Sequence, residues 1–310
     1  MIVALTGGVG GAKLAWGLNQ ILPPDRLKII VNTGDDFEHM GLHISPDLDT
    51  VMYTVAGIAN RNTGWGVADE TWEFMGALDR LGGPGWFQLG DRDLAMHVLR
   101  TARLRQGESL ADIADDTCAR LGIGCAITPM SDDPVRTVVH TTIGPLRFQD
   151  YFVRRRCEPC VSDVTYEGAG TARPHSRILS WLADSRLSII VFCPSNPFLS
   201  LGPILGMPEL KRTIANARAP KIAVSPIIAG AAVKGPAAKM LSEMGLEVSA
   251  LGIARHYLGL VDCLLVDEVD AHLAPAIEAL GMRVALAPIL MRSDQDRVRL
   301  ASRVIESGPS

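Results

Sequence analysis

The residues best suited to chemistry lie in a glycine-rich loop close to the start of the chain. The segment 6–13 reads Thr-Gly-Gly-Val-Gly-Gly-Ala-Lys and contributes Gly7, Gly8, Gly10, Gly11 and Lys13. Glycines let backbone amides approach an anion, a helix N-terminus adds partial positive charge, and Lys13 would add a full charge. Leu14 stands where a Walker loop has Ser or Thr, and the spacing before Lys13 also differs. We expect a phosphate site of another kind; a tight turn without a ligand is the alternative.

A second polar group follows the next apolar run, 27–31. It contains Asn32, Asp35 and Asp36, which would lie at the carboxyl edge of a parallel sheet, where such sheets bind ligands. Asp35 or Asp36 could hold a ribose hydroxyl, because they follow the glycine loop by roughly 20 residues, as in a Rossmann site. Metal binding, substrate binding and a solvated turn remain open for them.

Alternating carboxylates occur in the segment 44–50, at Asp47 and Asp49. Hard oxygen ligands suit Mg²⁺, which often bridges one or two carboxylates to substrate phosphates. Asp47 could instead cap a helix that begins near Leu48. That alternative makes Asp49 the stronger candidate for a metal ligand.

A third acidic segment opens a predicted helix at 91–105. Asp91 is a plausible N-cap and Asp93 suits the first turn, which leaves Arg92 free to contact a phosphate or a neighbouring acid. His97 lies one turn after Asp93 but has no evident partner. No Ser-His-Asp order or Cys-His pair indicates a covalent nucleophile.

Two rigid polar loops follow predicted strands in the second half of the chain. Ser195 and Asn196 lie between prolines, and a second loop runs from Ser225 to Gly230. Hydroxyl and amide groups in such loops could contact phosphate, ribose or base, although turns alone would also explain them. Lys234 could add a second cationic helix start.

The elements that must position these residues alternate between short β-branched runs and amphipathic stretches. Predicted strands are 2–5, 27–31, 187–193, 221–225, 247–251, 261–266 and 283–287, and predicted helices include one from Gly11 and those at 208–216, 235–244, 270–280 and 293–306. This rhythm predicts an α/β fold, a Rossmann-like doubly wound and mostly parallel sheet.

The middle of the chain has a different pattern. Helices are expected at 67–80, 91–105 and 109–121, and an antiparallel hairpin at 137–142 and 144–152. We therefore expect a nucleotide-binding core from 1–66 and 185–310, with 67–184 as a mostly helical insertion that carries a β-hairpin.

Composition narrows the class of protein. The 310 residues are 47% hydrophobic and 21% charged with a net charge of -4, which excludes a disordered or fibrous chain and gives no reason to expect nucleic-acid binding. The apolar start is too short for a signal peptide, and no run approaches the roughly 20 residues of a membrane helix. We expect a cytoplasmic protein without membrane insertion, with reduced cysteines; Cys157 and Cys160 lack the second pair that a zinc site needs.

Taken in order, seven motifs resemble those of the 2-phospho-L-lactate transferase family. They read Gly-Gly-Val-Gly-Gly-Ala-Lys, Asn-Thr-Gly-Asp-Asp, Ser-Pro-Asp-Leu-Asp-Thr, Leu-Gly-Asp-Arg-Asp, Met-Ser-Asp-Asp-Pro, Pro-Ser-Asn-Pro and Ser-Pro-Ile-Ile-Ala-Gly, and the resemblance runs from residue 5 to about residue 292. Each motif is weak alone; their order and spacing are specific.

The resemblance implies a step in the biosynthesis of the deazaflavin coenzyme factor 420. A phospho-acid would pass from a guanosine diphosphate conjugate to the ribityl hydroxyl of the deazaflavin Fo, releasing GMP. Gly7 to Lys13, Ser195, Asn196 and the loop from Ser225 to Gly230 would hold the donor. Asp49, with Asp35 possible, would bind Mg²⁺, and the segments around Asp47 and Gln88, with the insertion, would face Fo. Asp47, Asp49 or Asp91 would accept the hydroxyl proton. A homodimer is also expected from the resemblance.

Two other classes of function remain open from the sequence. One is a regulatory nucleotide-sugar-binding protein of the gluconeogenesis-factor branch of the same superfamily, which would not require Asp47, Asp49 and the segment 89–93. The other is a nicotinamide dehydrogenase, but the glycines do not spell Gly-x-Gly-x-x-Gly cleanly. The acid portion of the donor, whether lactate, enolpyruvate or glycerate in type, is left open.

Overall fold

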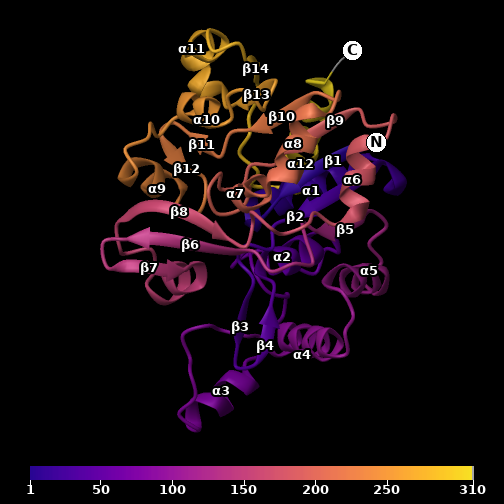
Figure 1. Ribbon diagram of the computed structural model, residues 1–310, viewed down its shortest axis with the longest axis vertical. Helices are drawn as coiled ribbons and strands as arrows, with labels where there is room; N and C mark the ends of the chain where they lie inside the picture. Colours follow the sequence, from indigo (N-terminus) through magenta and orange to yellow (C-terminus); the bar gives the residue numbers. More distant parts are fainter. Residues whose placement is uncertain (309–310) are drawn as a thin grey trace.

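A seven-stranded parallel sheet runs through the centre of the molecule (Figure 1). The structure is a computed structural model that describes residues 1–308. The strands, from one edge to the other, are β14 (Arg283–Leu286), β13 (Cys263–Val266), β10 (Lys221–Val224), β9 (Ile189–Phe192), β1 (Ile2–Thr6), β2 (Leu27–Val31) and β5 (Ala126–Pro129). The predicted doubly wound α/β fold is confirmed.

Helices cover both faces of this sheet because the central strands are apolar on both sides. In β1, Ile2 and Ala4 face one hydrophobic core, and Val3 and Leu5 face the other. The first core is closed by α1 (Gly8–Ile21), α2 (Pro46–Val55), α5 (Leu110–Arg120) and α12 (Asp294–Glu306). The second is closed by α6 (Ser176–Ala183), α7 (Gly202–Gly206), α8 (Pro208–Asn216), α9 (Ala237–Glu243), α10 (Ala250–His256) and α11 (Ala274–Glu278).

An arm extends from the body below the sheet (Figure 1). It is built from the hairpin of β3 (Phe37–His39) and β4 (Leu42–Ile44) together with α3 (Glu73–Arg80) and α4 (Asp91–Arg105). Its small core centres on Ile44, Met75 and Leu89. The arm lies directly after the Asn32 to Asp36 segment and therefore borders the carboxyl edge of β2.

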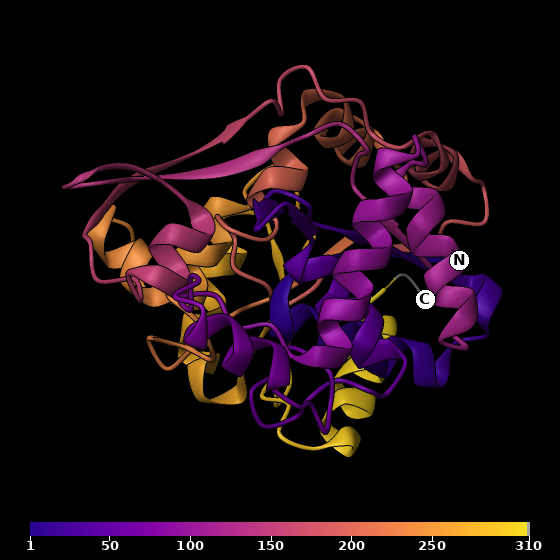
Figure 2. The same cartoon turned by 90° about the horizontal axis from the view of Figure 1, so that it is seen from below.

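A separate antiparallel sheet contains β6 (Arg136–Thr141), β7 (Gly144–Arg147) and β8 (Val161–Glu167). Seen from below, these magenta strands extend to the left of the molecule, and α4 lies to their right (Figure 2). The remaining elements are the hairpin of β11 (Ile227–Ile228) and β12 (Ala231–Ala232) and the short helical turns η1 (Pro24–Arg26), η2 (Asp150–Arg154) and η3 (Glu268–Leu273). Within residues 1–308, no helix has the length and apolarity needed to cross a membrane.

Some predicted elements differ from the structure. The predicted strand at 247–251 is wrong: the Ser249 hydroxyl accepts from the Gly252 amide and starts α10 there. The helix predicted at 67–80 begins only at Glu73. Within the predicted insertion 67–184, β5 pairs in parallel with β2 as the edge of the central sheet, so this segment is partly core. The helix predicted at 109–121 is present as α5, whose N-cap Ser109 accepts from the Asp112 amide.

Candidate active site

The central sheet reverses its strand order between β1 and β9. Numbered in chain order within this sheet, the strands run 3-2-1-4-5-6-7, and ligands of doubly wound folds bind where the order reverses. Gly7 follows β1 directly, and Ser195 lies three residues beyond the end of β9. The Ser195 hydroxyl donates to the Gly7 carbonyl at 2.8 Å, and the Gly7 amide donates to Ser195 Oγ at 3.3 Å. This residue therefore joins the two halves of the sheet at the reversal point.

The glycines of the loop are needed for close packing. A Cβ on Gly10 would overlap the Pro194 carbonyl, and one on Gly11 would overlap the Thr6 hydroxyl. Gly8 has a φ of 64°, which an L side chain rarely adopts. The amides of Gly7 and Gly8 lie at the N-terminus of α1. Gly10 and Gly11 allow α1 to pack closely against the loop that follows β9.

Asp47 supplies the anion that the Gly8 amide contacts in this structure. Its Oδ1 accepts from the Gly8 amide at 2.7 Å, and its Oδ2 accepts from Asn32 Nδ2 at 2.9 Å. Burial raises the pKa of Asp47 to about 6 against these two hydrogen bonds. The N-cap of α2 is Ser45, so the alternative that Asp47 is the N-cap is wrong.

Asp35 and Asp36 lie beside Asp47 and complete what we call the carboxylate trio. Both are buried. Burial raises the pKa of Asp35 well above its ordinary value, and the charge of Asp47 raises it further. Asp36 Oδ2 accepts from the Ser45 hydroxyl at 2.5 Å and lies 3.2 Å from His43 Nε2, while its Oδ1 is buried without a hydrogen-bond partner.

Asp49 lies in a different environment from the trio. It forms a two-pronged ion pair with Arg100, one of whose bonds joins Nη1 and Oδ2 at 3.1 Å, and the Arg100 and Asp49 side chains are 1% and 6% exposed. His97 is not isolated, because its Nδ1 lies 3.7 Å from Asp49 and its Nε2 3.4 Å from Asp93. Tyr53 donates to Asp93 at 2.8 Å.

The two acidic clusters differ in their charge balance. Asp49, Asp93 and His97 offer ligand atoms within 4.8 Å of one another, but Arg100 already neutralises Asp49. Among residues 1–308, no member of the carboxylate trio forms an ion pair with Lys or Arg. Buried carboxylates without a counter-charge are costly, so a cation near the trio would be favoured. Among residues 1–308, however, only Asp49, Asp93 and His97 bring three ligand atoms within 4.8 Å of one another, and the predicted pair of Asp49 and Asp35 stays a prediction.

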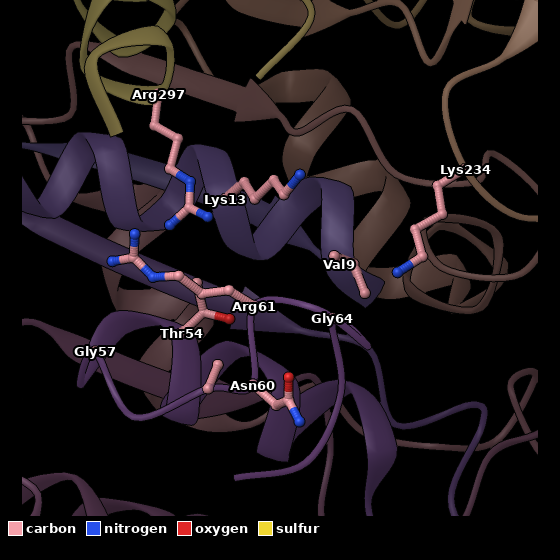
Figure 3. A pocket seen from close by; sticks show the side chains of 10 residues that line it. Val9, Lys13, Thr54, Gly57, Asn60, Arg61, Gly64, Lys234 and Arg297 are labelled. Carbon is pink, nitrogen blue, oxygen red and sulfur yellow. The ribbon is translucent and has the colours of Figure 1, made fainter. Parts of the chain in front are cut away.

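Lys13 is engaged by a residue outside the glycine loop. Its Nζ donates to the Met291 carbonyl at 3.0 Å, and its side chain lies along the outer flank of α1. There it lines a pocket with Arg61, Lys234 and Arg297 (Figure 3). The predicted cradle of amides and lysine is therefore divided between two neighbouring surfaces.

The other predicted contacts on the arm have local partners. Asp91 accepts from the Thr71 hydroxyl at 2.5 Å and from two amides at the start of α3, and the Thr71 bond is the main cause of its lowered pKa. It caps α3 and not α4, whose N-cap is Gly90. Arg92 donates to Ala68 O at 3.0 Å, and Gln88 to Gly85 O at 2.7 Å.

The polar loops of the C-terminal half stabilise their own turns. Asn196 Oδ1 accepts from two amides, those of Phe198 at 2.9 Å and Leu199 at 3.1 Å. Ser225 is buried, and its hydroxyl donates to Ile227 O at 2.9 Å. Gly230 adopts a φ of 72° in the turn between β11 and β12. Of this group, Ser195 alone bonds to the glycine loop.

Sequence reasoning missed Arg100, Tyr53 and the role of His97. Their spacing carries a signal, because Asp93, His97 and Arg100 recur at i, i+4 and i+7 on α4, and Tyr53 lies one turn after Asp49 on α2. It also missed Arg61 and Arg297, which come from distant segments and have no local motif.

Comparisons with known proteins show the family to which the chain is similar. The sequence profile of the family described as 2-phospho-L-lactate transferase CofD matches residues 2–286. A relative from Streptomyces griseus named phosphoenolpyruvate transferase is 42% identical, with 98% of this chain and 97% of the relative covered. A relative from Methanosarcina mazei named 2-phospho-L-lactate transferase is 37% identical, with 99% and 100% covered.

Solved structures share the fold. A protein of the UPF0052 family from Bacillus halodurans superimposes with a TM-score of 0.64 at 13% identity, over 98% of each chain. A second structure of that protein gives a TM-score of 0.65 at 16% identity, again over 98% of each chain. These likenesses concern architecture, whereas the end-to-end profile match and the relatives above 30% identity concern the family. The chain belongs to the 2-phospho-L-lactate transferase CofD family.

Proposed function

We propose that the protein transfers a phospho-acid from its guanosine diphosphate conjugate to the terminal hydroxyl of Fo, releasing GMP. The observation that supports this most is the carboxylate trio beside the amides of Gly7 and Gly8 at the reversal point of the sheet. The relatives named phosphoenolpyruvate transferase are 41–42% identical, and those named 2-phospho-L-lactate transferase are 36–38% identical. That difference favours the enolpyruvate donor.

Charge explains why this reaction would need a cation here. The donor diphosphate is anionic, and three buried carboxylates would repel it at close range. Mg²⁺ bound by Asp35 and Asp47 would screen the diphosphate and stabilise charge on the departing GMP. The raised pKa of Asp35 is the feature of this chain that such an ion would relieve.

The chain's own groups would then position the reactants. The Gly8 amide, released from Asp47, would donate to a phosphate oxygen at the N-terminus of α1. Ser195 would keep the loop after β9 against Gly7. Positioning and charge stabilisation dominate phosphoryl transfer of this kind.

The proton of the attacking hydroxyl also needs an acceptor. Asp49 is neutralised by Arg100, and Asp91 holds three donors of its own, so neither has a free oxygen for that role. Asp36 Oδ1 is buried and unpartnered, while Ser45 and His43 hold its other oxygen. We propose that Asp36 Oδ1 accepts the proton of the attacking hydroxyl.

The test is a transfer assay with Fo, Mg²⁺ and each of the three guanosine conjugates, read by mass spectrometry of the deazaflavin product. The expected product carries enolpyruvate, and Asp35→Asn and Asp47→Asn should lose at least about 100-fold in turnover, as loss of a charge-stabilising group does. Asp25→Asn is the matched control. Asp25 is exposed in η1, which directly precedes β2 and so lies at the amino ends of the strands, away from the site. Absence of product with all three conjugates, or trio variants as active as the control, would overturn the proposal. The expected homodimer stays a prediction that light scattering tests.

A further inference from the structure

A cationic pocket lies on the outer flank of α1, beside the glycine loop. It is lined by side chains from α1, from the segment after α2, from the segment before α9 and from α12 (Figure 3). The charged ones are Lys13, Arg61, Lys234 and Arg297. Four cations meet here in a chain whose net charge is -4.

The positive charge of this pocket is poorly compensated. Asp294 is the carboxylate that pairs with it, at 3.1 Å from Arg61 and 3.4 Å from Arg297. Lys13 and Lys234 each donate to a backbone carbonyl, those of Met291 at 3.0 Å and Thr63 at 2.9 Å. Within residues 1–308 neither lysine forms an ion pair. Four cations and one carboxylate leave three positive charges.

Arg297 packs against Trp16 at one wall of the pocket. Its guanidinium carbon lies 5.3 Å from the centre of the Trp16 ring. The residue is 9% exposed, and its Nε is buried without a hydrogen-bond partner. A buried donor without a partner is costly, so this wall of the pocket carries an uncompensated polar group.

The cations also act on one another. Burial lowers the pKa of Lys13, and the charges of Arg297 and Lys234 lower it further. Burial likewise lowers the pKa of Lys234. A bound anion would reverse both effects.

The size of the pocket suits a small group. Its cavity has a volume of about 60 Å³. A water molecule needs about 10–15 Å³ of such volume. The cavity can therefore hold about four to six groups the size of a water molecule. A phosphate has five heavy atoms and a carboxylate three. Val9, in the first turn of α1, and Gly64 also line this space, and both Lys234 Nζ and the Val9 side chain lie beside Gly64.

We propose that the pocket of Lys13, Arg61, Lys234 and Arg297 is an anion site for the phosphate or carboxylate of a small molecule. The anion has two possible sources. It is either the acid end of the transferred group, which would reach over Val9 from the loop, or a separate small anion from solution. The first source rests on the proposed function, and the second does not.

The test is isothermal titration with inorganic phosphate and with phosphoenolpyruvate at low ionic strength. Wild type should bind at least one of them, and Arg61→Gln/Lys234→Gln should weaken that binding at least about tenfold, the loss of 1.4 kcal/mol of interaction. Lys211→Gln/Arg212→Gln is the matched control. It removes the same two charges from exposed positions on α8, and its affinity should stay within about twofold of wild type, as expected for surface charges away from the site.

Competition distinguishes the two sources. If the acid end of the donor is the occupant, phosphoenolpyruvate should compete with the guanosine conjugate but not with GDP, and the pocket variant should bind GDP normally. If the occupant is a separate anion, its binding should persist with the conjugate at saturation. No heat with either anion at about 10 mM, well above a weak Kd of 1 mM, or equal weakening in both double variants, would overturn the proposal. Because calorimetry needs no turnover, this result is independent of the transfer assay.

Discussion

The buried pair of Asp49 and Arg100 leads to a quantitative prediction. In Arg100→Met the Asp49 carboxylate, whose side chain is 6% exposed, loses its counter-charge. Breaking a buried pair on one side costs about 3–5 kcal/mol, since a charge is left in a low-dielectric interior. With a urea slope of about 3 kcal/mol per M, the unfolding midpoint should fall by on the order of 1 M.

The size of this loss should depend on pH in a fixed direction. Burial raises the folded pKa of Asp49 even beside Arg100, and losing that positive charge raises it further, so the folded state of the variant binds a proton more readily. The deficit should therefore be larger at about pH 8 than at about pH 5, where protonation removes the uncompensated charge. Urea unfolding followed by circular dichroism at both pH values measures it.

Two control variants make the test specific. Asp49→Asn/Arg100→Met removes both charges and should recover most of the loss. Arg186→Met breaks the exposed pair with Asp184, where the arginine side chain is 76% exposed, and should leave the midpoint unchanged. The reasoning is refuted if Arg100→Met unfolds at the wild-type midpoint, or if the double variant is no more stable than the single one.

Three further predictions concern the loop, the trio and the arm. Gly10→Ala should destabilise the fold by about 1–3 kcal/mol, because the new Cβ overlaps the Pro194 carbonyl; in Gly76→Ala the nearest atom is 3.8 Å away, and its thermal midpoint should hold or rise. Magnesium affinity, measured by calorimetry, should fall as pH drops from about 7 to about 5, because protons compete for Asp47 near its pKa of about 6; a flat profile would contradict this. Asp91→Ala should speed amide exchange in α3 with transfer retained, since Asp91 caps that helix; lost transfer with unchanged exchange would return Asp91 to the chemistry.

The sheet and its ligand edge could be predicted because each strand carries a local signal. Short β-branched runs marked six of the seven central strands, and the glycine loop and Asn32 to Asp36 followed two of them. The strand predicted at 247–251 was wrong because Ser249 caps the start of a helix there, and this capping outweighs the strand propensity of the neighbouring residues. β5 was missed because its four residues end in Pro129 and lack alternation.

The partners of the site residues could not be predicted, because they are set by tertiary packing. Nothing near Asp49 in the sequence indicates that Arg100, 51 residues later, neutralises it. The same holds for the flank of α1, where Lys13 meets Arg297 only because α12 packs on α1. Sequence motifs identified the carboxylates of the site. The positions of the positively charged side chains could be known only from the folded structure.

The contact between Gly7 and Ser195 bridges 188 positions of the chain, and this separation affects how the protein folds. The strands on one side of the reversal point, β1, β2 and β5, can pair before residue 189 exists, whereas the candidate active site closes only when β9 adds to β1. Contacts so distant in sequence are costly in loop entropy and form late. A ligand bound at this joint would recognise only the completed sheet and would stabilise it by mass action, so its binding would measure how much of a preparation has finished folding.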